Sequence, residues 1–142
     1  MEERSSRTPE VSLEDTFLIA VSGLPEEDVR AAVVAEALGH LQQGFDAHYA
    51  GDGATDDDVL VGDNSYALAV ETIARLDEPR FVAVASRMIR DGAGLIADGG
   101  AVSLRTWIPH LAGLLDIISG EGEERSEARI EAAAEDLRGR SG

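Results

Sequence analysis

Apolar positions recur at helical spacing along most of this chain, with breaks at clusters of glycine, proline and aspartate. Residues three and four positions apart lie on one face of an α-helix, so each recurring set predicts one helix with a buried face. No stretch shows the convincing alternation of period two that indicates a half-buried strand. The pattern predicts about six helices: five span residues 12–23, 25–49, 58–77, 79–100 and 103–119, and the sixth is the helix-prone tail after Gly120. Because the connections between them are short, we expect an all-α fold in which neighbouring helices pack antiparallel in a bundle.

The predicted helix ends depend on capping residues and prolines. Ser12 precedes an apolar run and has Asp15 three positions later, which is the spacing of a capping box. Pro25 stands where a first-turn proline belongs, so the second helix is expected to begin there. Pro109 lies inside the apolar pattern of the fifth helix, and it either kinks that helix or resets its start.

Two of the predicted helices carry broad apolar faces. The face of the second helix is formed by Val29, Val33, Ala37, Leu41 and Phe45, with Val34 and Leu38 beside them. The face of the third helix is formed by Val59, Leu60, Tyr66, Ala67, Val70, Ile73 and Ala74. Both faces are wider than a surface helix needs.

The chain divides into three parts by composition. Residues 1–11 are polar and are predicted to be a flexible N-terminus, whereas residues 12–120 form the predicted bundle domain. Residues 121–142 form an acidic, helix-prone tail whose only large apolar residues are Ile130 and Leu137. A tail with so little to bury leaves apolar surface of the bundle for another subunit, so we expect a homo-oligomer or a heteromer.

The charge balance narrows the function classes. The chain has 28 acidic and 12 basic residues, which gives a net charge of −16. Every basic residue is arginine, and an acid-rich, lysine-free composition is typical of extreme halophiles, where salt screens the self-repulsion. An acidic protein from a GC-rich genome is the alternative. No nucleic-acid partner is expected, because there is no basic patch to neutralise phosphates.

Three further observations exclude classes of protein and of site. The chain has no cysteine, so it forms neither disulfides nor zinc–thiolate sites. Its longest apolar runs are too short to span a bilayer, and its N-terminus lacks the apolar core of a secretory signal. We therefore expect a soluble, cytoplasmic protein with no membrane span. His40 and His48 are too far apart for a compact metal-binding pair, and His110 is isolated.

Residues 59–94 resemble a central region of the trans-polyprenyl diphosphate synthases; they read VLVGDNSYALAVETIARLDEPRFVAVASRMIRDGAG. In that all-α family, a helix begins with an apolar run and Gly-Asp, and a short break separates it from a second helix. The positions that match this pattern are Val59, Leu60, Gly62, Asp63, Ala67, Ala69, Ala74 and Leu76, with the break at Asp77-Glu78-Pro79. The resemblance extends more weakly back to Ala35 and forward to about Gly120. It implies a short, degenerate, haloarchaeal member of the family with a truncated isoprenoid synthase fold.

The Gly62-Asp63 pair is the part of the resemblance that suggests chemistry. Gly62 lets a neighbouring helix backbone approach closely, and the resemblance implies that Asp63 faces a polar cavity for Mg²⁺ and diphosphate. The alternative is that Gly62 is only a packing notch and Asp63 is a solvated residue. Asp46 and Asp52 lie where the family carries its first aspartate-rich motif, but their spacing is irregular. The second motif is absent, so such a cavity would be vestigial.

Three hypotheses for the function follow. The first is a non-catalytic partner or regulatory subunit of a prenyl diphosphate synthase in isoprenoid biosynthesis, with no cofactor of its own. The second is a weakly active prenyltransferase or Mg²⁺–diphosphate binder that uses Asp46, Asp52 and Asp63. The third is a helical interaction protein unrelated to isoprenoids, whose alanine-rich helices alone produce the resemblance. The first hypothesis fits best, because diphosphate ionisation needs Mg²⁺ held by two facing aspartate motifs.

Overall fold

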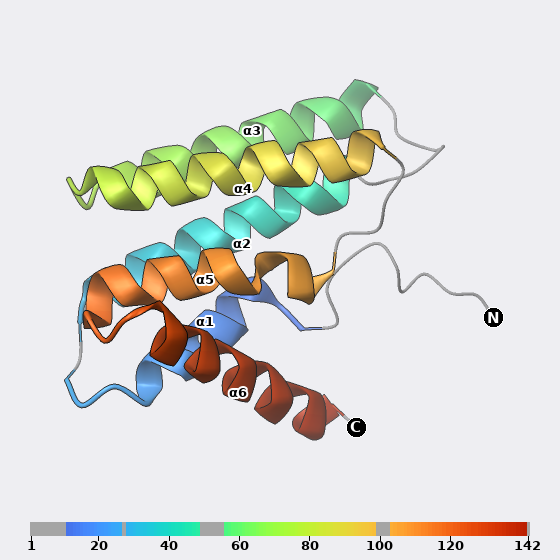
Figure 1. Cartoon of the computed structure of the whole chain (residues 1–142). Coiled ribbons are helices and arrows are strands. Elements are labelled where there is room, and N and C mark those ends of the chain that lie inside the picture. The colour runs from blue at the N-terminus through green and yellow to red at the C-terminus, as the bar shows by residue number, and fades with distance from the viewer. Residues whose placement is uncertain (1–10, 27, 49–55, 99–102, 142) are drawn as a thin grey trace.

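The computed structural model describes residues 11–26, 28–48, 56–98 and 103–141. These ranges contain six helices and no strand, which confirms the expected all-α class (Figure 1). In chain order the helices are α1 (Leu13–Ser22), α2 (Arg30–His48), α3 (Asp56–Ala74), α4 (Pro79–Ala97), α5 (Leu104–Ser119) and α6 (Glu123–Ser141).

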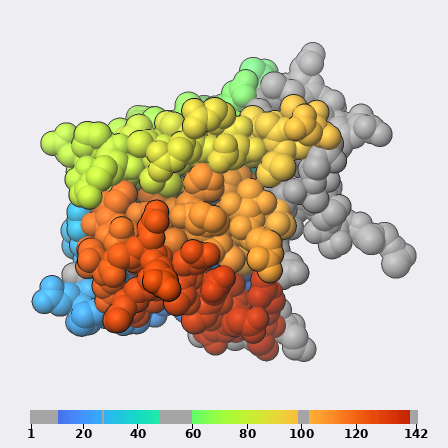
Figure 2. Space-filling model, in the orientation of Figure 1, coloured from blue at the N-terminus to red at the C-terminus, as the bar shows by residue number. Residues whose placement is uncertain are grey.

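Helix α2 is the central helix of the bundle. Its most extensive contact is with α3, and it also contacts α1, α4 and α5. Helices α2, α3 and α4 lie together on one side of the molecule, and α1, α5 and α6 lie together on the other (Figure 1). Figure 2 shows the face on which α5 (orange) lies between α4 (yellow) and α6 (red). Consecutive helices from α2 to α5 run in opposite directions, as short connections predict.

Side-chain caps determine where the first two helices begin. The Ser12 hydroxyl accepts a hydrogen bond from the Asp15 N–H at 2.9 Å, so the predicted cap of α1 is confirmed. Helix α2 begins at Arg30, and the start predicted at Pro25 is wrong. The reason is that the Asp28 carboxylate accepts the Arg30 N–H at 2.9 Å and caps the helix there.

Helix α5 accommodates its proline without a new start. Pro109 lies inside a helix that is continuous from Leu104 to Ser119, so a reset start is excluded. Gly120 ends the helix with a φ of 69°, and its N–H donates to the Asp116 carbonyl at 2.7 Å. This left-handed conformation favours glycine, which is the usual residue at such a helix end.

The core is built mostly from aliphatic residues and alanine around a few large rings. The largest fully buried side chains are Trp107, Phe17, Phe81, Leu13, Leu38, Leu41, Ile73, Met88, Leu111, Leu114, Leu115 and Ile130. Helix α6 packs on α5 and α1 and buries Ser126, Ile130, Ala133 and Ala134. This differs from the expectation of a tail with little to bury, because its small side chains allow close approach to the bundle.

Both predicted apolar faces need correction. Val29 is 87% exposed, because it precedes the first residue of α2. Leu60, Ala67 and Ala74 of α3 are exposed as well, although they were predicted on its buried face. Among the α3 residues whose side chains are described, which exclude Val59, the buried ones are Gly62, Ser65, Tyr66, Ala69, Thr72 and Ile73. Tyr66 and Ile73 are buried as predicted, but small and polar residues form the rest of the buried face, so the apolar pattern alone locates that face only in part.

Candidate functional site

Helices α2 and α3 come close together where each carries a glycine. Gly62 is buried, and its carbonyl oxygen lies 3.2 Å from the point where a Cβ on Gly44 would stand. The Tyr66 ring of α3 lies even closer to that point. A side chain on Gly44 would therefore collide with the ring, so glycine is required for this approach. Gly62 lies in a close helix contact, as its expected packing role requires.

Aromatic rings fill the interior beside this contact. The Phe45 ring stacks on Trp107 with centroids 4.7 Å apart, and it lies tilted against Tyr66 with centroids 5.5 Å apart. Gly92 of α4 makes room for the same ring, because a Cβ there would stand 2.9 Å from Phe45 Cδ1. We call Phe45, Tyr66 and Trp107 the aromatic cluster. It joins α2, α3, α4 and α5, so its rings pack the centre of the bundle.

The phenol of Tyr66 is kept neutral by its surroundings. Burial raises the pKa of Tyr66 to about 12, and the negative charge of Asp63 acts in the same direction. The hydroxyl therefore stays protonated throughout the physiological pH range. The aromatic cluster thus offers neither a base nor an anionic nucleophile at neutral pH.

The predicted site carboxylates have different surroundings. Asp63 is exposed on α3, whereas Asp46 is half-buried on α2. Asp52 lies outside the described residues. Within the described ranges, no group of three or more carboxylates and histidines is arranged to hold a metal ion. A vestigial Mg²⁺–diphosphate cavity therefore stays a prediction.

Two histidines each lie beside one carboxylate. His110 of α5 has its Nε2 3.0 Å from an Asp91 oxygen of α4, so this pair connects two helices. His40 Nε2 lies 3.9 Å from a Glu36 oxygen of its own helix. A single carboxylate neighbour suits a structural role better than metal binding, which needs several ligands. The side chain of His48 lies outside the described residues.

Arginine–carboxylate pairs hold the ends of the helices. Hydrogen bonds from the Arg30 side chain lower the pKa of Asp28, with the Nη2–Oδ2 distance at 2.8 Å. Arg129 donates two hydrogen bonds to Glu121, at 2.8 and 3.1 Å, and these lower the pKa of the Glu121 carboxyl. Arg129 also donates to the Gly23 carbonyl at 3.1 Å, which connects α6 to the end of α1. Such bidentate pairs fix geometry.

Five large apolar side chains are exposed in the described part of the chain, and they fall into two groups. Leu60, Val61 and Leu68 lie on the side of α3 away from the bundle, where they are 65%, 56% and 37% exposed. We call this the α3 outer face. Leu18 and Val29 form the second group, on α1 and immediately before α2. Sequence reasoning missed the α3 outer face because it assigned Leu60 to the buried side.

We take the α3 outer face as the candidate site, because exposed apolar side chains gather there. Among the described residues, no helix combines the length and the apolar character needed to cross a lipid bilayer. Comparison with known proteins finds no matching family model, no similar curated protein and no similar solved structure.

Proposed function

We propose that this chain is a non-catalytic helical subunit that binds a prenyl diphosphate synthase-like partner through the α3 outer face. The observation that carries the proposal is the exposure of Leu60 and Val61, directly before Gly62-Asp63. They belong to the same stretch, residues 59–94, that resembles the polyprenyl synthases. Exposed apolar side chains that gather on one helix face favour docking against another protein.

The aromatic cluster supports the non-catalytic part of the proposal. Transfer of a prenyl group from its diphosphate needs a polar cavity in which carboxylates hold Mg²⁺. Here the inner side of the α2–α3 contact is packed with the rings of Tyr66, Phe45 and Trp107. The catalytic alternative would have to use Asp63 on the exposed side of α3, with Asp46 half-buried on α2.

A binding experiment tests the partner. The polyprenyl synthase of the same host is titrated with the full chain, and we expect a stable complex. Leu60→Ser combined with Leu68→Ser should weaken the complex about tenfold or more, as loss of central apolar contacts does. Ala83→Ser is the control, because it also changes an exposed apolar side chain but lies on α4, outside the α3 outer face. No complex with the synthase, or a complex indifferent to the double substitution, would overturn the proposal.

An activity assay tests the non-catalytic part separately. The chain alone, with Mg²⁺, should not condense isopentenyl diphosphate with an allylic diphosphate. Turnover that is lost in Asp63→Ala would establish the prenyltransferase alternative instead. A chain that self-associates through Leu60 and Leu68 and ignores the synthase would be an interaction protein unrelated to isoprenoids.

We also propose that the chain works in the cytoplasm of a halophile. The support is its net charge of −16 without a single lysine. Salt should then raise the melting temperature as KCl increases from dilute to molar, because self-repulsion is screened. A melting temperature that is flat or falls over that range would contradict the halophile assignment.

A further inference from the structure

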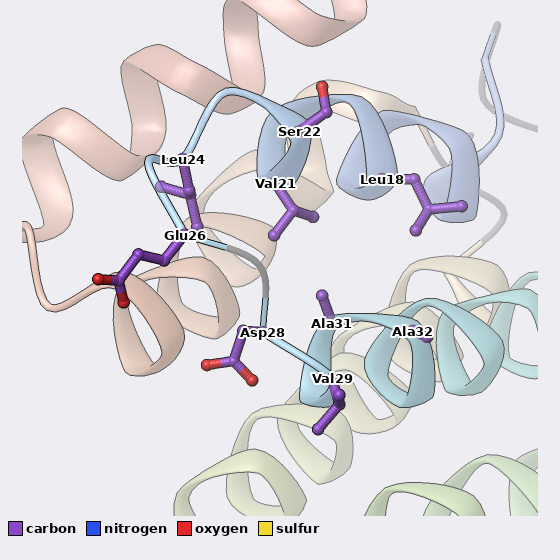
Figure 3. A pocket seen from close by; sticks show the side chains of 9 residues that line it. All are labelled: Leu18, Val21, Ser22, Leu24, Glu26, Asp28, Val29, Ala31 and Ala32. Atoms are coloured by element: carbon purple, nitrogen blue, oxygen red, sulfur yellow. The ribbon is translucent and has the colours of Figure 1, made fainter.

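A groove separates the end of α1 from the start of α2 (Figure 3). It encloses about 380 Å³ and is lined by Leu18, Val21, Ser22, Leu24, Glu26, Asp28, Val29, Ala31 and Ala32. We call it the α1–α2 groove. Figure 3 shows Leu18 and Val21 pointing from α1 toward the α2 side of the groove, where Val29, Ala31 and Ala32 lie. Its walls are therefore apolar on both sides.

The exposed apolar residues of the groove come from two different elements. Leu18 is 40% exposed on α1, and Val29 is 87% exposed just before α2. Single exposed apolar residues are normal on a protein surface. Leu18 and Val29 both line this one groove, and exposed apolar residues that gather at a hollow mark interaction sites.

The walls of the groove are held in place by contacts elsewhere. The Leu13 N–H at the start of α1 donates to the Gln42 side-chain carbonyl of α2 at 2.8 Å. At the other end, Arg129 of α6 donates to the Gly23 carbonyl at 3.1 Å. The groove is thus preformed, and a ligand does not have to order its walls on binding.

The charge of the groove is negative at one end. Glu26 and Asp28 lie together there, and none of the lining residues is basic (Figure 3). The guanidinium of the adjacent Arg30 donates to the Asp28 carboxylate at 2.8 and 3.0 Å, so these two charges offset each other and Glu26 carries the negative charge of this end. A positively charged group of a partner would complement this end, because opposite potentials across an interface favour association.

We propose that the α1–α2 groove binds a cationic amphipathic segment of a partner protein. A leucine-sized side chain of that segment enters between Leu18 and Val29, and a flanking arginine or lysine lies near Glu26. A small molecule fits less well. Ligand pockets bury about 70–90% of the surface of such a ligand. This groove is open to solvent, because Val29 on its wall is 87% exposed. A second copy of the chain fits less well too, because the groove presents no basic side chain to the acidic surface of another copy. This site is separate from the α3 outer face.

The probe for the test is a synthetic, fluorescein-labelled helical peptide with leucines one turn apart and flanking arginines. A control peptide carries glutamate in place of each arginine. We expect the full chain to bind the arginine peptide in a fluorescence anisotropy titration, and to bind the glutamate peptide at least about tenfold more weakly. Rising KCl should weaken binding of the arginine peptide, because salt screens its attraction to the acidic end.

Substitutions locate the site. Leu18→Ser and Val29→Ser should each reduce the affinity for the arginine peptide about tenfold. Glu26→Gln should reduce this affinity and also make it less dependent on the KCl concentration. Leu60→Ser is the matched control and should leave the affinity unchanged, because it lies on the α3 outer face. Equal binding of the two peptides, or affinities that ignore Leu18 and Val29, would overturn the proposal. A dimer of the chain that Val29→Ser dissociates would overturn it in favour of a second copy.

Discussion

Helix α2 has two contacts of opposite character. Against α3, Gly44 and Gly62 bring the backbones close, and the Tyr66 ring occupies the space that a side chain on Gly44 would need. Against α1, Ala31 and Ala32 line a groove of about 380 Å³ together with Leu18 and Val21. The same helix thus has a filled contact on one side and an incompletely filled one on the other.

The difference shows that the size of the side chains at a contact decides whether it closes. Glycine on α2 and α4 is matched by a ring from a neighbouring helix, as Gly92 is by Phe45. The alanines at the start of α2 line a groove instead. A filled contact fixes the fold, because packed interiors resist any change of volume. An unfilled apolar contact leaves surface that another protein can cover.

The largest effect is expected when the filled contact is emptied. Phe45→Ala should reduce the free energy of unfolding by about 3–5 kcal/mol, because it removes a buried ring and leaves a cavity. Urea denaturation followed by circular dichroism measures this loss. The emission of Trp107, the single tryptophan, should also change because it loses its stacking partner. A loss below about 1 kcal/mol would mean that the cluster does not hold the bundle together.

The effect of a glycine-to-alanine substitution on stability should depend on the space around the glycine. Gly44→Ala should cost about 1–3 kcal/mol, because the new methyl group collides with the Tyr66 ring. Gly94→Ala is the control in α4, where a Cβ would meet nothing within 4 Å. It should stabilise the protein by about 0.5–1 kcal/mol, because alanine restricts the unfolded chain. Denaturation curves that move in the same direction for both variants would contradict the close approach of α2 and α3.

Alkaline pH should weaken the filled contact through Tyr66. The unfolded phenol ionises near its ordinary pKa of 10.0 and the folded one at about 12, so stability should fall as pH rises between these values. In a Tyr49→Phe background, the absorbance of tyrosinate reports Tyr66 alone. Asp63→Asn should lower the pKa of Tyr66 slightly, because a neighbouring negative charge is removed. Titration of Tyr66 near pH 10.0 would show that it is not buried.

The helices themselves could be predicted from the sequence, because apolar periodicity reports burial along one face. Their ends and orientations were harder to predict. The start of α2 depends on a hydrogen bond between Asp28 and Arg30, which competes with the proline signal at Pro25. On α3, the buried residues Ser65 and Thr72 are polar, so the side that contacts α2 gives a weak apolar signal. The predicted face therefore included Leu60, which is exposed.

The two sites were predictable only in part. The α3 outer face was missed, because Leu60 was assigned to the buried side. In the α2–α3 contact, Gly62 could be singled out because glycine inside a helix suggests close approach. The approach of Tyr66 to Gly44 could not, because it joins two helices and leaves no local pattern. The α1–α2 groove depends on where two elements separate, and this is set by the packing of the whole bundle.

The smallest effect on stability is expected when a side chain at the wall of the α1–α2 groove is made larger. Ala32→Leu places a larger side chain at the wall of the α1–α2 groove, where it can extend into open space. Leucine and alanine have similar helix propensities, so the free energy of unfolding should change by no more than about 0.5 kcal/mol. The same denaturation experiment on Gly44→Ala gives the contrast, since one methyl group there is expected to cost more than a whole leucine side chain here. If Ala32→Leu destabilised the protein as much as Gly44→Ala, the α1–α2 groove would be a closed contact. Helix α2 would then be as tightly packed against α1 as it is against α3.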